Sequence, residues 1–262
     1  MLDLAVCVSY DGKSNIYETI DAIKAAGFKK VFVQWYDKDW EISQQDQVDY
    51  VRKAGLEIIF AHLGYQNIND IWLDKEEGEA LIERYKRNID EARANGIPMV
   101  MMHAVSKTEA PYPNEIGLRR FEAIVDYANQ QGIEIGFENT KLPGYQRYLL
   151  SNLKGKAGIC LDFGHCHAHF KDEFDFDFFR NRITSVHIHD NFGARDEHLL
   201  PFDGTIDWKW AMSSLKKAGF NRELTMEIVY HGQYPEMMTV EEFYRKGHEI
   251  GMKLAQMFEE AE

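Results

Sequence analysis

The sequence is poor in cysteine and in long apolar runs. Its 262 residues include three cysteines, Cys7, Cys160 and Cys166. A small, odd number of cysteines in a chain long enough to form its own core argues against a disulfide framework, and we expect a reducing, cytoplasmic setting. No stretch approaches the roughly 18 uninterrupted apolar residues of a membrane span, and the first residues lack the basic start of a signal peptide. We therefore expect no membrane partner.

Positive charge is also scarce. Lys and Arg number 30 against 43 Asp and Glu, which gives a formal net charge of −13. Because phosphate contacts are normally made by surplus Lys and Arg, this balance disfavours nucleic acid as a partner, while a metal-mediated contact stays open. Low-complexity runs and linkers rich in Pro, Gly or Ser are lacking as well. We therefore expect one domain over residues 1–262.

The sequence does contain a repeated alternation of strand-like and helix-like segments. Short runs of β-branched and aromatic residues alternate with segments whose apolar residues recur every three or four positions. Eight alternations in a chain of this length predict an α/β fold, the (β/α)8 TIM barrel, rather than an open doubly wound sheet. The expected strands are 2–10, 30–36, 56–63, 98–105, 133–139, 157–163, 183–190 and 224–230. The expected helices are 15–26, 43–54, 76–95, 115–131, 145–152, 174–180, 208–218 and 240–258.

Metal-type side chains lie at or near the carboxyl ends of six expected strands. TIM-barrel enzymes place their reacting groups at this end, where inward side chains from several strands meet. Four carboxylates among the candidates, one of them in a loop, would repel one another if they came together without cations. The strand-end residues are His62, His103, Glu138, Asp162, His187 and Glu227. Together they predict a metal centre.

Three further candidates lie between residues 158 and 207. His165 follows Asp162 by three residues, and Asp196 and His198 lie in a polar loop after the seventh expected strand. Imidazole and carboxylate together suit a divalent ion such as Zn²⁺ or Mn²⁺. Taken singly, each residue also has a structural explanation, because a lone histidine is often a core residue and Asp162 could cap a helix.

Neighbouring histidines leave one choice open. His189 lies two residues beyond His187 and shares its face of a strand, so spacing does not decide which of the two coordinates an ion. We interpret His167 and His169 as loop or surface residues. Cys160 and Cys166 are interpreted as small buried residues rather than nucleophiles, because the sequence places no base beside them.

Five short motifs resemble those of the xylose isomerase-like TIM-barrel superfamily, and the resemblance covers nearly the whole chain. The pattern looks like the sugar phosphate isomerase/epimerase group and its relative endonuclease IV, of AP endonuclease family 2. The motifs are Phe137-Glu138-Asn139-Thr140, Leu161-Asp162-Phe163-Gly164-His165, His187-Ile188-His189-Asp190, Asp196-Glu197-His198 and Met226-Glu227.

The resemblance implies a site for one to three ions. An isomerase-like site would hold one divalent ion with Glu138, Asp162, His187 and Glu227. An endonuclease-like arrangement would add a second ion with His62, His103 and Glu138, and a third with His165, Asp196 and His198.

The function that the resemblance implies is a metal-dependent isomerase or epimerase of a small sugar or sugar phosphate. Glu138 and Glu227 would be its catalytic residues and pass a proton through an enediolate. Two alternatives stay open: a multi-zinc phosphoesterase that cleaves DNA at abasic sites, and a catalytically silent barrel that binds a sugar or a partner. The sequence sets neither the sugar nor the oligomeric state. Aromatic candidates for the walls of a sugar pocket are Tyr10, Trp35, Tyr36 and Tyr65.

Overall fold

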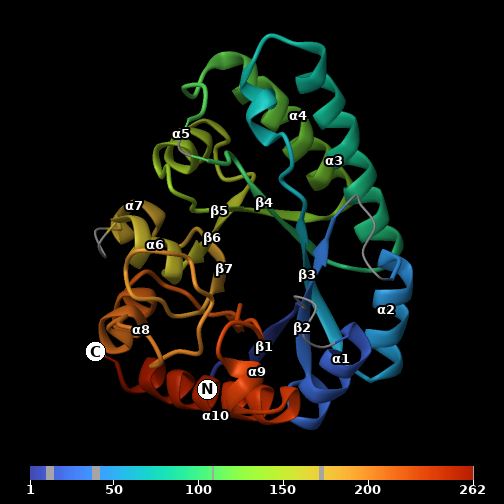
Figure 1. The fold of residues 1–262 in the computed structure, drawn as a ribbon. Helices are drawn as coiled ribbons and strands as arrows, with labels where there is room; N and C mark the ends of the chain where they lie inside the picture. The colour runs from blue at the N-terminus through green and yellow to red at the C-terminus, as the bar shows by residue number, and fades with distance from the viewer. Residues whose placement is uncertain (10–14, 37–41, 108, 171–173, 262) are drawn as a thin grey trace.

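The structure, a computed structural model, describes residues 1–9, 15–36, 42–107, 109–170 and 174–261. Within these residues, eight parallel strands alternate with helices that surround them (Figure 1). The strands are β1 (Leu4–Val8), β2 (Lys30–Trp35), β3 (Glu57–Leu63), β4 (Met99–His103), β5 (Glu134–Glu138), β6 (Gly158–Asp162), β7 (Ile183–His187) and β8 (Leu224–Met226). The helices are α1 (Ile16–Ala25), α2 (Gln44–Lys53), the 3₁₀ helix η1 (Ile68–Trp72), α3 (Glu76–Ala94), α4 (Glu115–Gln131), α5 (Gly144–Asn152), α6 (Phe163–Phe170), α7 (Phe176–Phe179), α8 (Trp208–Lys217), α9 (Tyr234–Met237) and α10 (Val240–Glu260).

The sheet is nearly closed on itself. Its strand order is β7-β6-β5-β4-β3-β2-β1-β8, so β1 pairs with both β2 and β8. The two outer strands meet through a parallel bridge between Ile188 and Met226, where the Ile188 N–H donates to the Thr225 carbonyl at 2.9 Å. An open doubly wound sheet would leave these two edges apart. The predicted (β/α)8 TIM barrel is therefore confirmed.

Alternate residues of the strands build two separate apolar layers, because successive side chains of a strand point to opposite faces. One layer lies between the sheet and the helices, and Tyr85 and Ile89 of α3 are buried in it. The other fills the barrel interior. Its members are Ala5, Cys7, Phe32, Ile59, Phe60, Met99, Met101 and Cys160. All three cysteines are buried and free, as expected for residues that fill space.

The two last strands end earlier than predicted. β7 ends at His187 rather than Asp190, because Asp190 leaves the ladder and forms an antiparallel bridge with Leu199. β8 ends at Met226 rather than Tyr230, and Val229 donates its N–H to the carbonyl of His198 instead. The ends of both strands thus pair with the loop that carries Asp196 and His198.

Three short helices, η1, α6 and α9, were not predicted, because one or two turns carry little periodic signal. α6 begins directly after β6, where a side-chain oxygen of Asp162 accepts the N–H of His165 at 2.6 Å. His167 and His169 therefore lie on a helix rather than in a loop, and both are half-buried, with part of each side chain at the surface. Across the described part of the chain, no helix has the length and apolar character to cross a membrane.

Asp190 shapes the loop that follows β7. Its carboxylate is fully buried and accepts four hydrogen bonds. The donors are the N–H groups of Asn191 (2.9 Å), Ile206 (3.1 Å) and Phe202 (2.9 Å) and the indole Nε1–H of Trp208 (2.9 Å). Gly204 packs so closely that a Cβ there would lie 2.3 Å from Asp190 Oδ1. One carboxylate thereby folds the segment that carries Asp196 and His198.

Replacing the Asp190 carboxylate by an amide is expected to destabilise the fold. In Asp190→Asn, an NH₂ group would face N–H donors, and the charge-assisted hydrogen bonds would be lost. We expect the free energy of unfolding to fall by about 2–3 kcal/mol. Urea denaturation of both proteins measures the difference. Asp177→Asn is the control, because this side chain is 86% exposed and should change stability by less than about 0.5 kcal/mol. Equal losses in both variants would contradict this role for Asp190.

Candidate metal centre

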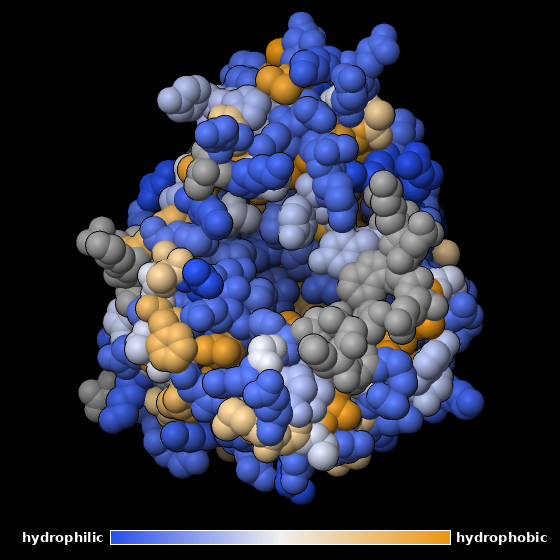
Figure 2. Space-filling view, viewed as in Figure 1, coloured by the Kyte–Doolittle hydropathy of each residue, from blue (hydrophilic) through white to orange (hydrophobic). Residues whose placement is uncertain are grey.

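The carboxyl ends of the strands bring the predicted ligands to one place. His103 pairs in register with Glu138, and Asp162 pairs with His187. His62 lies opposite Gln34, which faces the same cavity. Figure 2 looks onto this face, where hydrophilic residues surround a hollow near the centre of the molecule. The cavity measures about 220 Å³ and is lined by Ser9, Gln34, Tyr36, His62, Tyr65, His103, Glu138, His165, Asp196, His198, Glu227 and Val229.

Glu138 is the most connected carboxylate of the site and is 2% exposed. Its Oε2 lies 2.7 Å from His62 Nε2 and 3.0 Å from His103 Nε2, and its Oε1 lies 3.2 Å from His165 Nδ1. Burial by itself would raise the pKa of Glu138, but His103 and His187 outweigh it and hold the pKa well below its usual value. The carboxylate is therefore ionised at neutral pH.

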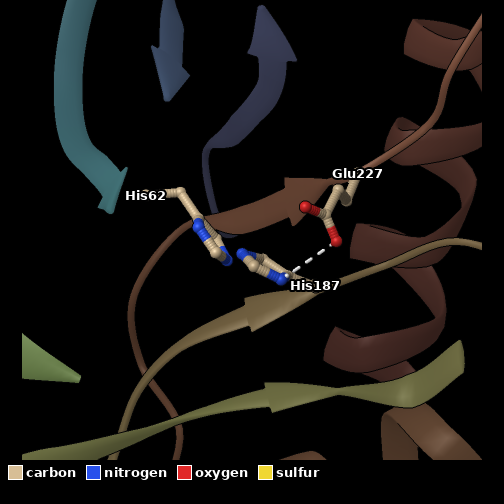
Figure 3. Close-up of side chains that lie close together, drawn as sticks. All are labelled: His62, His187 and Glu227. Carbon is tan, nitrogen blue, oxygen red and sulfur yellow. Dashed lines mark ion pairs between the residues drawn. The ribbon is translucent and has the colours of Figure 1, made fainter. Parts of the chain in front are cut away.

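His187 lies at the floor of the site, between the ligands and the apolar interior. Its Nδ1 is 3.0 Å from Glu227 Oε2, the contact drawn in Figure 3, where the His62 and His187 rings lie against each other. The same nitrogen is 3.6 Å from Glu138 Oε1 and 3.7 Å from Asp162 Oδ2. The ring also stacks on Phe32, with centroids 5.2 Å apart. The side chain is fully buried.

A second set of contacts surrounds Asp196. Its Oδ2 lies 3.1 Å from His165 Nε2 and 3.3 Å from His198 Nε2, and its Oδ1 lies 3.5 Å from His189 Nε2. Burial would lower the pKa of His198, but the Asp196 carboxylate raises it to about 10. The His189 and His198 rings stack with centroids 4.1 Å apart. His165, Asp196 and His198, which the sequence predicted, thus come together with His189.

The structure gives His187 and His189, between which spacing had left the choice of ligand open, different surroundings. His187 faces Glu138 and Glu227, whereas His189 lies 3.2 Å from Asp162 and turns toward Asp196. Both side chains are fully buried. The predicted metal set did not include His189. One indication in the sequence that His189 could belong to the set was its place two residues after His187, and so on the same face of a strand. Its partners, Asp162 and Asp196, become visible only once the loop after β7 is in place.

The donor atoms suit a divalent ion. Four groups of His, Asp and Glu side chains have ligand atoms within 4.8 Å of one another. Neither ring nitrogen of His187 makes a hydrogen bond of suitable geometry, although both are buried. Nitrogen and carboxylate oxygen donors of this kind fit Zn²⁺ or Mn²⁺. The groups are Glu138-Asp162-His187-Glu227, His62-His187-Glu227, His62-His103-Glu138 and His189-Asp196-His198.

Backbone carbonyls orient three imidazoles around the cavity. The Nδ1 atoms of His62, His165 and His198 lie 3.2, 2.8 and 2.9 Å from the carbonyls of Leu63, Asn139 and Glu227. A hydrogen bond from Nδ1–H to a carbonyl leaves Nε2 as the nitrogen that can take a metal. In each case that Nε2 faces a carboxylate of the site. Metal-ligating histidines commonly have such partners.

The expected aromatic walls are formed in part. Tyr36 and Tyr65 line the cavity, and Tyr65 stacks on the His103 ring with centroids 4.1 Å apart. Tyr10 lies outside the described residues. The prediction is wrong for Trp35, which is buried on the helix side and donates its indole N–H to Glu91 at 2.8 Å. Its neighbour Gln34 faces the cavity instead, as strand alternation from Phe32 indicates.

Comparisons with known proteins agree with this architecture. The uncharacterized protein y4fM of Sinorhizobium fredii is 28% identical over 191 residues, which cover 67% of this chain and 60% of that protein. The uncharacterized protein MJ1311 of Methanocaldococcus jannaschii is 25% identical over 188 residues, 64% of each chain. The chain thus spans less than two thirds of the length of these relatives.

Solved structures share the fold, a sugar epimerase among them. L-ribulose 3-epimerase superimposes with a TM-score of 0.76 at 15% identity, covering 99% of this chain and 97% of that one. The IOLI protein with a binding zinc atom gives a TM-score of 0.75 at 16% identity, covering 98% and 99%. A family model described as a xylose isomerase-like TIM barrel matches residues 20–250. The chain therefore belongs to the xylose isomerase-like TIM-barrel family.

Proposed function

We propose that the chain is a metal-dependent isomerase or epimerase of a small sugar or sugar phosphate. The observation that carries the proposal is the approach of two buried carboxylates, Glu138 from β5 and Glu227 from the end of β8, to the same imidazole nitrogen of His187. Both carboxylates line the cavity. Its volume of about 220 Å³ lies below the roughly 300–1,000 Å³ of sites for drug-sized ligands. Such a site favours a small polar substrate.

Glu138, Asp162, His187 and Glu227 would hold the ion. Bound there, a divalent ion would supply Lewis-acid polarisation of the carbonyl and the adjacent hydroxyl of a sugar. Burial would raise the pKa of Glu227, but His187 and His198 outweigh it and lower the pKa, so the carboxylate is ionised and able to act as a base. Each carboxylate has two oxygens, so one oxygen could contact an ion while the second oxygen of the same group faces the substrate.

The two glutamates then have complementary tasks. One removes a proton from the carbon beside the sugar carbonyl, which leaves an enediolate, and the other takes a proton from solvent and delivers it to carbon. Return to the former carbonyl carbon, with the hydroxyl proton passing from one enediolate oxygen to the other, isomerises the sugar, and return to the opposite face of the same carbon epimerises it. The sugar epimerases among the structural neighbours support this assignment, including D-psicose 3-epimerase with D-tagatose.

Loss of either glutamate base is expected to slow turnover. Glu138→Gln and Glu227→Gln keep the shape of the side chain but cannot accept a proton, so each should lower turnover by about 10²- to 10⁴-fold. Solvent deuterium incorporation into a panel of ketoses and ketose phosphates, followed by proton NMR, reports proton transfer without prior choice of the product. Glu83→Gln on α3 is the control, because its side chain is 66% exposed. Unchanged exchange in both site variants would rule the mechanism out.

A second candidate function is favoured by two further donor groups beside the central one. His62-His103-Glu138 and His189-Asp196-His198 each bring three ligand atoms together. Clustered ions of this kind generate hydroxide and stabilise a leaving oxygen in phosphoester hydrolysis. The alternative function is therefore a multi-zinc phosphoesterase that acts on abasic DNA. The net charge of −13 argues against it, because DNA phosphates are normally bound by surplus Lys and Arg.

Metal number separates the two candidates. Elemental analysis of the full chain, first treated with a chelator and then reloaded with Zn²⁺ or Mn²⁺, is expected to give one tightly held ion for the isomerase. Two or three ions together with cleavage of an abasic oligonucleotide would instead establish the phosphoesterase. His103→Gln provides a check, because it removes a ligand from the His62-His103-Glu138 group and leaves the central group intact. The variant should lose an ion only if that outer group is occupied.

A further inference from the structure

We propose that Asn139 is a positioning residue for the metal centre. Its amide holds the end of β6 against the end of β5, and its carbonyl orients His165. The inference rests on the proposed metal-dependent function. Asn139 is fully buried and does not line the cavity, so it acts through its neighbours rather than on a substrate.

The first part of the argument is a two-point clamp on Asp162. Asn139 Oδ1 accepts the backbone N–H of Asp162 at 2.7 Å, and Asn139 Nδ2 donates to the carbonyl of the same residue at 2.9 Å. The last registered pair between β5 and β6 is Glu138 with Cys160. Beyond it, the side-chain amide takes the place of the next peptide group in the ladder. Asp162 is thereby fixed relative to Glu138.

The second part concerns His165. The carbonyl of Asn139 lies 2.8 Å from His165 Nδ1, which leaves Nε2 facing Asp196 at 3.1 Å. The clamped Asp162 accepts the backbone N–H of His165 at 2.6 Å and so begins α6. One residue thus sets both the position of the backbone before His165 and the orientation of its ring.

A neutral amide is the group that this place requires. Asp162 offers one donor and one acceptor on its backbone, and an asparagine side chain matches both at once. A carboxylate would oppose the Asp162 carbonyl and add negative charge beside Glu138 and Asp162. Leaving both backbone groups unpaired would instead free the end of β6 to move, and misplaced ligands bind a metal less tightly.

The chain contains a matched control for this clamp. Asn69 makes the same pair of bonds to another backbone: its Nδ2 donates to the Ser106 carbonyl at 2.6 Å, and its Oδ1 accepts the Ser106 N–H at 2.8 Å. These bonds join the segments after β3 and β4, and none of the metal-suited groups contains either residue. Asn69→Ala therefore removes an equivalent structural clamp without touching the centre.

The test is the Zn²⁺ affinity of the metal-free full chain, measured by competition with a chromophoric chelator. Asn139→Ala is expected to weaken Zn²⁺ binding by about 10- to 100-fold, as for other partners of metal ligands. Asn69→Ala should lower the thermal midpoint of the metal-free protein while leaving Zn²⁺ affinity unchanged. Equal Zn²⁺ affinity in Asn139→Ala and the wild type would overturn the inference, as would an equal loss of affinity in the Asn69 control.

A milder variant keeps the test decisive if alanine prevents folding. Asn139→Ser retains a hydroxyl that can make one of the two bonds to Asp162, so its Zn²⁺ affinity should fall below that of the wild type. Wild-type affinity in a folded Asn139→Ser protein would contradict the inference while the metal proposal stands. A wild-type chain that binds no Zn²⁺ or Mn²⁺ would overturn the proposed function and this inference with it.

Discussion

The attraction between buried carboxylates and imidazoles at the carboxyl end of the barrel is the interaction on which the site depends. Glu138, Asp162 and Glu227 are all less than 10% exposed. Taking an unpaired charge out of water costs several kcal/mol, so these groups are tolerated only beside histidines or a cation. An arriving divalent ion would replace the positive charge of protonated imidazoles, and the same side chains would then serve as its ligands.

The rest of the barrel keeps this cluster in place. Phe32 and Phe60 fill the interior below it and stack on the His187 ring, which separates the charged layer from the apolar one. Asp190 folds the loop that brings Asp196 and His198 over the strand ends. The candidate metal centre is therefore supported by apolar packing on the barrel side and by a loop with a buried carboxylate at its base on the other.

Glu138 links the two candidate chemistries, because it belongs both to the central donor group and to the group with His62 and His103. If only the central group held an ion, Glu138 would remain able to move a proton, as an isomerase requires. If the group with His62 and His103 held one as well, Glu138 would serve as a ligand in both groups, which favours hydrolysis. The number of bound ions thus decides what this one carboxylate can do, and the family fold is compatible with either outcome.

The alternation of strand-like and helix-like segments in the sequence predicted the barrel. Because successive side chains of a strand point to opposite faces, the sequence also indicated which candidate ligands point into the barrel mouth. His62, His103, Glu138, Asp162 and His187 followed from their places at the ends of apolar runs. The same alternation would also have predicted that Gln34 points into the barrel. Local sequence therefore carried this information, and the structure places these side chains where the pattern indicated.

Only the tertiary structure decided the partners of His189 and the tasks of Asp190 and Asn139. Each depends on contacts between segments far apart in the chain, such as the 23 residues that separate Asn139 from Asp162. No local pattern encodes whether a polar side chain at a strand end will point at an ion or at a neighbouring backbone. That choice is made where strands and loops meet, because there every buried polar group must find a partner.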